Sequence, residues 1–252
     1  QREGLGWFPA LWKSLFEILG QPGSTFSNLQ PEADAPGAFV FGLGSSLSVL
    51  ALFSGSLLIV FIRMVGFRAL LSFDAIFGFL KVTATAIIGI SLGIYILVWC
   101  IHLTLKVLGA GEEGYVATFR GTNYTIGAFN AIAFASFAIF LLMSFVYPKG
   151  MGAMIMNPNS IVGLLFSLFG EWIPKGAVLA CVGWLVVAMR HVHRSQWGTA
   201  TGGVAVGLGI FYGLFRASVY LMAQSFFPWK LFIGAVIGLF VYFVGRLLNN
   251  FE

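Results

Sequence analysis

Long, nearly uninterrupted runs of apolar residues dominate the chain and set the spacing of its predicted elements. A helix needs about 20 apolar residues to cross the hydrocarbon core of a bilayer. Runs bounded by charges, prolines or glycines predict about six transmembrane helices, at residues 37–62, 82–107, 124–147, 175–189, 200–226 and 229–248. The pattern therefore predicts an all-α, polytopic helical membrane protein with short interfacial helices, divided into residues 1–36 and a bundle at 37–248.

The first element differs from the rest because its apolar residues recur at helical spacing with polar residues between them. It covers residues 8–19, and Gly20 and Pro22 provide a stop signal. This helix is too short to cross a bilayer, so we expect it to lie in the membrane plane with Trp7 and Trp12 at headgroup depth. The alternative is a helix packed against protein. Residues 21–36 are rich in Pro, Gly, Ser and acids, which predicts a linker.

Two further segments interrupt the long apolar runs. Residues 63–81 mix charges with Phe- and Leu-rich pieces and predict a loop with a short interfacial helix. Residues 161–172 predict a short apolar helix that ends near Glu171 and Pro174. Its length leaves three interpretations: an interfacial helix, a re-entrant helix, or the first half of a broken span.

The composition supports lipid as the solvent of this surface. Of the 252 residues, 59% are hydrophobic and 9% are charged, whereas a soluble domain carries about 25% charged residues. The net charge of +5 comes from bases at the ends of apolar runs, which is typical of contact with headgroups and not of nucleic-acid binding. Cys100 and Cys181 lie inside apolar runs and are interpreted as buried thiols.

The distribution of bases gives a weak indication of orientation. With six spans, Lys and Arg are almost evenly divided between the two sides. The basic cluster at 190–194 favours a cytoplasmic N-terminus. We expect the cell membrane as the location in a prokaryote and an endomembrane in a eukaryote.

Polar residues inside the apolar zone are the candidate functional residues, because charges at bilayer depth are costly. Arg216 lies well inside the fifth predicted span; it either binds a lipid phosphate or anionic substrate, or it snorkels or pairs with a carbonyl or with Glu171. His102 and Lys106 are four residues apart near the end of a span, as interface anchors or as a headgroup or proton site. Arg190 and His193 lie in the basic cluster after the fourth span.

Glu171 and Lys175 flank Pro174. They form either a local ion pair or a polar break between two half-helices, as in transporters. His191 and His193 face apart on a helix and have no acid or cysteine nearby, so no metal site is predicted. Nucleophile–base sets, phosphate loops and cofactor motifs are missing as well, so we expect neither enzymatic activity nor a cofactor.

Glycines spaced four apart provide a different kind of candidate site. Such pairs let two helix backbones approach closely, either within the bundle or against a partner protein. The pairs are Gly89 and Gly93, Gly203 and Gly207, Gly209 and Gly213, and Gly234 and Gly238.

Three stretches, taken together, resemble the prokaryotic branch of the Yip family, the Ypt/Rab-interacting membrane proteins. The lead-in contains Trp12, Pro22, Phe26, Leu29 and Pro31; the second span ends with His102 through Gly109 before GYVATFRGTNYT; the fourth contains Trp184 and ends with Arg190, His191 and His193. The resemblance covers about residues 7–225 and implies a helical membrane domain, usually of five spans, with a cytoplasmic N-terminus. Eukaryotic members have Rab-type GTPase partners, but the DLYGP-like motif is missing here, which leaves a GTPase partner doubtful.

These features favour a non-catalytic membrane protein that acts as a scaffold or as an accessory subunit of a membrane protein complex. Its expected partners are the lipid bilayer and other membrane protein subunits, and not nucleic acid. The alternative is a small transporter, channel or lipid-handling protein that uses Arg216 and the broken segment near Glu171.

Overall fold

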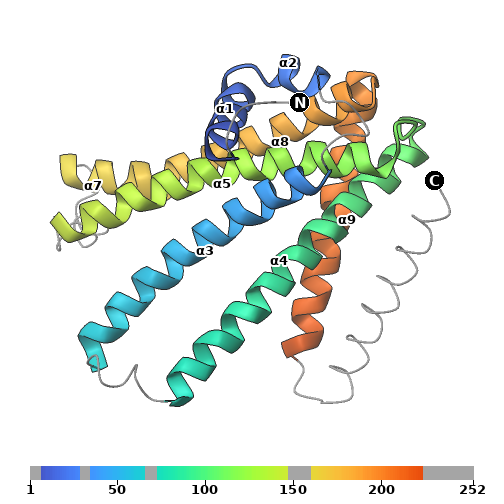
Figure 1. Ribbon diagram of the computed structural model, residues 1–252. Helices are drawn as coiled ribbons and strands as arrows, with labels where there is room; N and C mark the ends of the chain where they lie inside the picture. The colour runs from blue at the N-terminus through green and yellow to red at the C-terminus, as the bar shows by residue number, and fades with distance from the viewer. Residues whose placement is uncertain (1–6, 29–34, 66–72, 147–159, 224–252) are drawn as a thin grey trace.

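The computed structural model describes residues 7–28, 35–65, 73–146 and 160–223, and every regular element within these ranges is a helix (Figure 1). Five helical stretches in this part of the chain are long and apolar enough to cross a membrane: Ala35–Ser56, Thr83–Val107, Gly114–Ser144, Ile161–Val192 and Trp197–Ser218. The prediction of an all-α, polytopic helical protein is therefore confirmed. The sixth predicted span, residues 229–248, lies outside the described residues.

Several helices are longer than the apolar runs that predicted them. The elements are α1 (Trp7–Gly20), α2 (Pro22–Ser27), α3 (Ala35–Val65), α4 (Phe73–Val107), α5 (Gly114–Val146), α7 (Ile161–Ser167), a π-helical turn η2 (Leu168–Trp172), α8 (Ile173–Val192) and α9 (Trp197–Ala223). Of the segment predicted as a loop with an interfacial helix, residues 63–65 belong to α3 and residues 73–81 belong to α4, whereas residues 66–72 lie outside the described residues.

Helix α5 also begins ten residues before the predicted start of its span. It has 33 residues and is therefore about 50 Å long, compared with about 30 Å for the hydrocarbon core. Its first turns carry polar side chains, which stay helical because they are buried against neighbouring helices. The sequence pattern marked only the apolar part of this helix.

Residues 161–172, for which the sequence left three interpretations, form the first part of one continuous helical span. α7, η2 and α8 follow each other without a gap, so this span starts at Ile161 and not near Lys175. The N–H of Ile173 donates to the carbonyl of Leu168, in the i to i−5 register of a π-helix. The next carbonyl, that of Phe169, would need the N–H that Pro174 lacks. Ser136 of α5 instead donates its hydroxyl to this carbonyl at 2.8 Å.

We expect Ser136→Ala to lower the free energy of unfolding by about 0.6–1.7 kcal/mol, the range of hydrogen bonds between helices in membranes. The substitution removes the donor of the Phe169 carbonyl at a partly buried contact, in which Ser136 itself is buried. Ser144→Ala is the matched control, because Ser144 donates only to the Phe140 carbonyl of its own helix. Thermal unfolding in detergent measures both; equal melting temperatures for the two variants would contradict the assigned role of Ser136.

The N-terminal helices lie against the bundle and form part of its core. Leu15 and Ile18 of α1 are buried, whereas Trp12 and Phe16 stack on each other and are 43% and 66% exposed. α1 therefore packs on its own chain through one face and leaves Trp12 and Phe16 as an exposed aromatic stripe. The linker predicted at 21–36 includes the short helix α2, because Phe26 is fully buried and holds that segment against α8.

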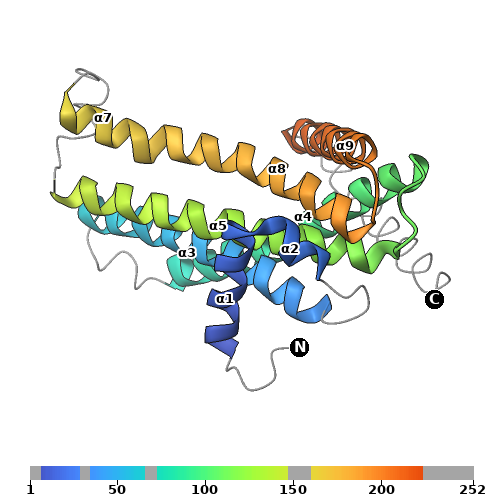
Figure 2. The same ribbon diagram turned by 90° about the horizontal axis from the view of Figure 1, so that it is seen from above.

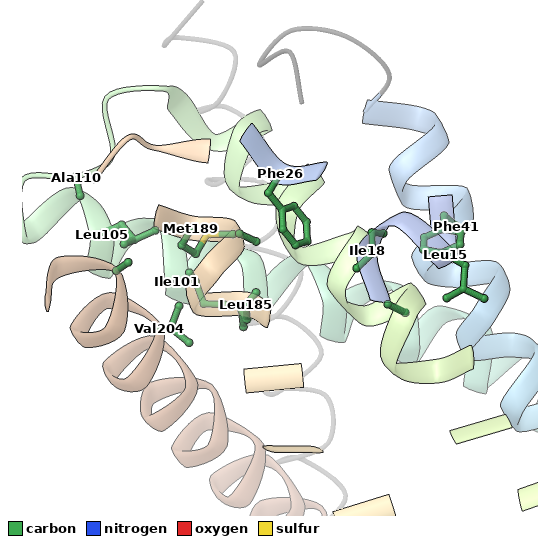
Figure 3. Close-up of a cluster of buried hydrophobic side chains, with 13 residues drawn as sticks. Leu15, Ile18, Phe26, Phe41, Ile101, Leu105, Ala110, Leu185, Met189 and Val204 are labelled. Atoms are coloured by element: carbon green, nitrogen blue, oxygen red, sulfur yellow. The ribbon is translucent and has the colours of Figure 1, made fainter. Parts of the chain in front are cut away.

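The buried core lies at one end of the bundle, where α1, α2 and the turns between α4 and α5 and between α8 and α9 come together (Figures 1 and 2). Figure 3 shows side chains from α2, α4, α8 and α9 meeting there, among them Phe26, Ile101, Met189 and Val204. From this end α3, α4, α5 and α9 diverge (Figure 1). The end that holds the core is called the packed end below.

Only one of the four predicted glycine pairs lies at a helix contact of the described structure. Gly203 of α9 faces the side chain of Leu105, and a Cβ at Gly207 would lie 2.8 Å from the Ile101 Cα. The other pairs have different surroundings. Among the described residues, no atom beyond the local helix lies within 4 Å of a Cβ built at Gly89, Gly93, Gly209 or Gly213, so these four do not lie at a contact between described helices. Gly234 and Gly238 lie outside the described residues.

Two contacts between α3 and α5 were not predicted. Gly42 faces the side-chain oxygen of Asn123, and Gly127 faces the ring of Phe41. Further along the same contact, the Asn130 amide donates to the Ser46 hydroxyl at 2.7 Å. Small and amide-bearing residues thus position α5 against α3.

Candidate functional site

Two histidines and a threonine form a hydrogen-bonded cluster at the packed end. The Thr118 hydroxyl lies 2.9 Å from Nδ1 of His102 and 2.7 Å from Nε2 of His193. The centroids of the two imidazole rings are 6.2 Å apart. Thr118 is fully buried, His193 is 6% exposed and His102 is half-buried. We call these three residues the His–Thr–His cluster.

Three separate elements supply the cluster. His102 lies a little more than one turn before the end of α4, Thr118 lies in the second turn of α5, and His193 is the residue that caps the C-terminus of α8. The tight turn between α4 and α5 includes Gly109 and Gly114, both with positive φ, which L side chains rarely adopt. This turn brings His102 and Thr118 together although sixteen residues separate them.

Burial keeps His193 neutral at physiological pH. Desolvation, with a smaller contribution from the nearby His102, lowers the pKa of His193 from 6.5 to about 4. The lowered pKa means that the unfolded chain binds more protons between these two values. This group therefore costs no stability above pH 6.5, and stability falls as the pH decreases from 6.5 toward 4.

The helix that carries Thr118 holds several more buried polar side chains. On α5, Thr122, Asn123 and Thr125 are fully buried, and Arg120 is 4% exposed. The Tyr115 ring meets His102 edge-on, with centroids 5.7 Å apart. The Tyr115 hydroxyl and Nδ1 of His193 are buried and make no hydrogen bond within the described structure. The cluster and its neighbour Tyr115 therefore each hold one polar atom whose hydrogen-bonding capacity is unused there.

Charged residues surround the cluster at the surface of the packed end. The guanidinium of Arg190 lies 4.2 Å from the ring centroid of Trp197, a cation–π contact that fixes the start of α9 on the end of α8. Arg194, which is 82% exposed, lies 3.6 Å from the carboxylate of Glu113, and an exposed pair of this kind contributes little. Lys106 is exposed on the last turn of α4.

The structure thus brings together two of the residues predicted from sequence and separates the others. His102 and His193 meet in the cluster, and Lys106 is exposed about one turn further along α4. Thr118 was missed. The polar stretch TFRGTNYT within an apolar region was the available signal, but nothing in the sequence pairs it with either histidine.

The remaining charged candidates lie elsewhere. Glu171 and Lys175 form an ion pair at 2.5 Å in and beside the π-turn, and Lys175 also lies 5.6 Å from the Trp172 ring centroid. The helix continues through this pair, so it does not mark an opening between half-helices. Arg216 is exposed on α9. Trp7 begins α1, and Trp12 is on its exposed aromatic stripe.

Within the described ranges, no three His, Cys, Asp or Glu side chains are close enough to hold a metal ion. The two cysteines are free thiols, Cys100 buried and Cys181 half-buried. Comparison with protein-family models, curated proteins and solved structures finds no match to this chain.

Proposed function

We propose that this chain is a non-catalytic integral membrane protein that serves as an accessory subunit or scaffold in a membrane protein complex. The observation that carries the proposal is an outward face of α9 made of small residues at every fourth position. Thr201, Ala205, Gly209 and Gly213 are all exposed, and no atom of the described chain lies within 4 Å of the Cβ direction of the two glycines.

The opposite side of the same helix supports this interpretation. There Gly203 and Gly207, also four residues apart, allow α4 to approach the α9 backbone closely. Without a hydrophobic force between helices in lipid, close contact through small residues is a principal source of association. The outer face repeats this pattern and is flanked by exposed apolar side chains such as Val206, Ile210 and Leu214. We therefore assign it to a helix of another membrane protein.

The resemblance to the Yip family belongs to the same proposal. The family usually has five spans, and the described residues contain five candidate spans. An accessory role requires no GTPase partner and no catalytic group, and it is compatible with either orientation.

The proposal predicts that Gly209→Leu weakens association with a partner but leaves the isolated protein folded, because the new side chain extends into open space. Gly183→Leu on α8 is the matched control, since that glycine is also exposed and free of neighbours within 4 Å. Native-membrane extraction in mild detergent, followed by mass measurement of the intact assembly, compares the two variants. We expect the Gly209 variant alone to lose the heavier species.

A photo-crosslinking residue at position 213 identifies what covers the face. Capture of a different membrane protein, abolished by Gly209→Leu, supports the accessory role. A monomeric wild-type protein, or a crosslink confined to this chain's own residues 224–252, would contradict it.

A further inference from the structure

The hydrogen atoms of the His–Thr–His cluster can be counted from its contacts. A hydroxyl has one hydrogen to donate, and each neutral imidazole carries one N–H. The Thr118 hydroxyl has no other hydrogen-bond partner among the described residues, so it donates to one ring and accepts from the other. Either His102 donates through Nδ1 and Thr118 donates to Nε2 of His193, or both bonds run in the opposite direction. The two rings are thus linked: the tautomer of one fixes the tautomer of the other.

We propose that His102, Thr118 and His193 form a single proton-binding site, in which one added proton is shared between the two imidazoles through the threonine hydroxyl. A proton taken up at Nε2 of His102 leaves its Nδ1–H to move to the hydroxyl oxygen, and the hydroxyl hydrogen moves to Nε2 of His193. The positive charge is then on His193, which carries hydrogens on both nitrogens, while His102 is neutral again with its hydrogen on Nε2. No bond other than these N–H and O–H bonds changes.

The two rings differ in burial, and this difference indicates the direction in which a proton moves through the site. His102 is half-buried and is the more accessible of the two rings, whereas His193 is 6% exposed. Nδ1 of His193 is buried and makes no hydrogen bond within the described structure. It is therefore the inner end of the path. Because the ring centroids are 6.2 Å apart, a second proton would place two cations side by side in a desolvated site, so the site takes up one proton only.

The charged and titratable groups around the site determine when it is filled. Those on the elements packed against it are Lys106 of α4, Tyr115 and Arg120 of α5, Arg190 and His191 of α8, Lys13 and Glu17 of α1, and Glu112, Glu113 and Arg194 in the turns. The cations among them outnumber the carboxylates, so the net charge around the site disfavours an added proton. The site therefore holds no added proton at neutral pH and binds one under acidic conditions. This inference does not depend on the proposed accessory role.

The test uses the full chain, labelled with ¹⁵N at histidine and reconstituted in lipid nanodiscs. The protein contains three histidines, so the spectrum is simple, and His102→Gln, His191→Gln and His193→Gln assign it. The imidazole nitrogen shifts report tautomer and charge as the pH is lowered. We expect His102 and His193 to change together in one common step equivalent to one proton. His191 should titrate separately.

Thr118→Val removes the hydroxyl and nearly keeps the volume, and Thr118→Ser keeps the hydroxyl. We expect Thr118→Val to split the common step into two, separated by about one pH unit or a tenfold difference in proton affinity, whereas Thr118→Ser keeps the step. Helicity and elution volume at pH 8 show whether each variant is folded. If Thr118→Val does not fold, the wild-type titration decides the question. Two independent steps in the wild type, or identical titrations with Val and Thr at position 118, would overturn the proposal.

Discussion

Gly207→Ala is expected to lower the free energy of unfolding by about 1–3 kcal/mol, the usual cost of adding volume to a packed contact. A methyl group at position 207 would lie 2.8 Å from the Cα and 3.0 Å from the N atom of Ile101. These atoms belong to the backbone of α4 and cannot rotate away. The helices α4 and α9 must therefore separate, which also disturbs Val204 and Leu105 in the core at the packed end.

Gly209→Ala on the same helix is the control for this prediction. Its Cβ meets no atom within 4 Å, and alanine is a better helix former than glycine by about 1 kcal/mol. The control should therefore be neutral or slightly stabilising in the isolated protein. Thermal unfolding of both variants in the same detergent measures the difference; a Gly207 variant as stable as the Gly209 variant would show that α4 and α9 do not pack as described.

The second large effect is expected for Gly127→Ala, again about 1–3 kcal/mol. A Cβ at position 127 would overlap the Cδ1 and Cε1 atoms of Phe41. Phe41 is 7% exposed and also packs against the ring of Tyr124, so its ring has little room to move. The substitution should push α3 away from α5 at the start of both spans.

A double-mutant cycle with Phe41→Leu separates this overlap from a general loss of stability. Phe41→Leu removes the ring and destabilises the protein by itself, but it makes room for the methyl group. We expect the double variant to be more stable than the sum of the two single effects predicts, with a coupling energy of about 0.5–3 kcal/mol. Additive effects would mean that the overlap between residues 41 and 127 is not the cause.

The sequence was sufficient to predict the class of fold, because a surface that is solvated by lipid restricts the fold that the chain can adopt. An apolar run that crosses lipid must form a helix to satisfy its backbone. For α3, α4 and α9, at least one helix end lies within a few residues of the predicted end of the span. The helix boundaries were predicted wrongly where tertiary contacts, and not the apolar pattern, determine the local structure. At the start of α5, tertiary burial keeps polar residues helical. At Pro174, a π-turn and the Ser136 hydroxyl together satisfy the backbone, so the helix continues where the pattern indicated an interruption.

The candidate site could be predicted only in part for a related reason. His102 and His193 were recognisable as polar residues near the ends of spans. Their partner was not, because a threonine in a helix is usually bonded to its own backbone, as the Thr125 hydroxyl is to the carbonyl of Gly121. Only the tertiary arrangement shows that Thr118 bonds to two side chains from other helices.

The excess length of α5 has an electrical consequence. Its apolar part from Ile126 to Val146 is about 30 Å long by itself, enough for the hydrocarbon core. With that part in the core, Thr118 would lie beside the headgroups of one leaflet. A charge that crosses the whole membrane gains about 2.3 kcal/mol per 100 mV, but a proton bound near one surface crosses almost none of that voltage. We therefore expect proton occupancy to follow the acidity of one compartment and to be indifferent to the membrane potential.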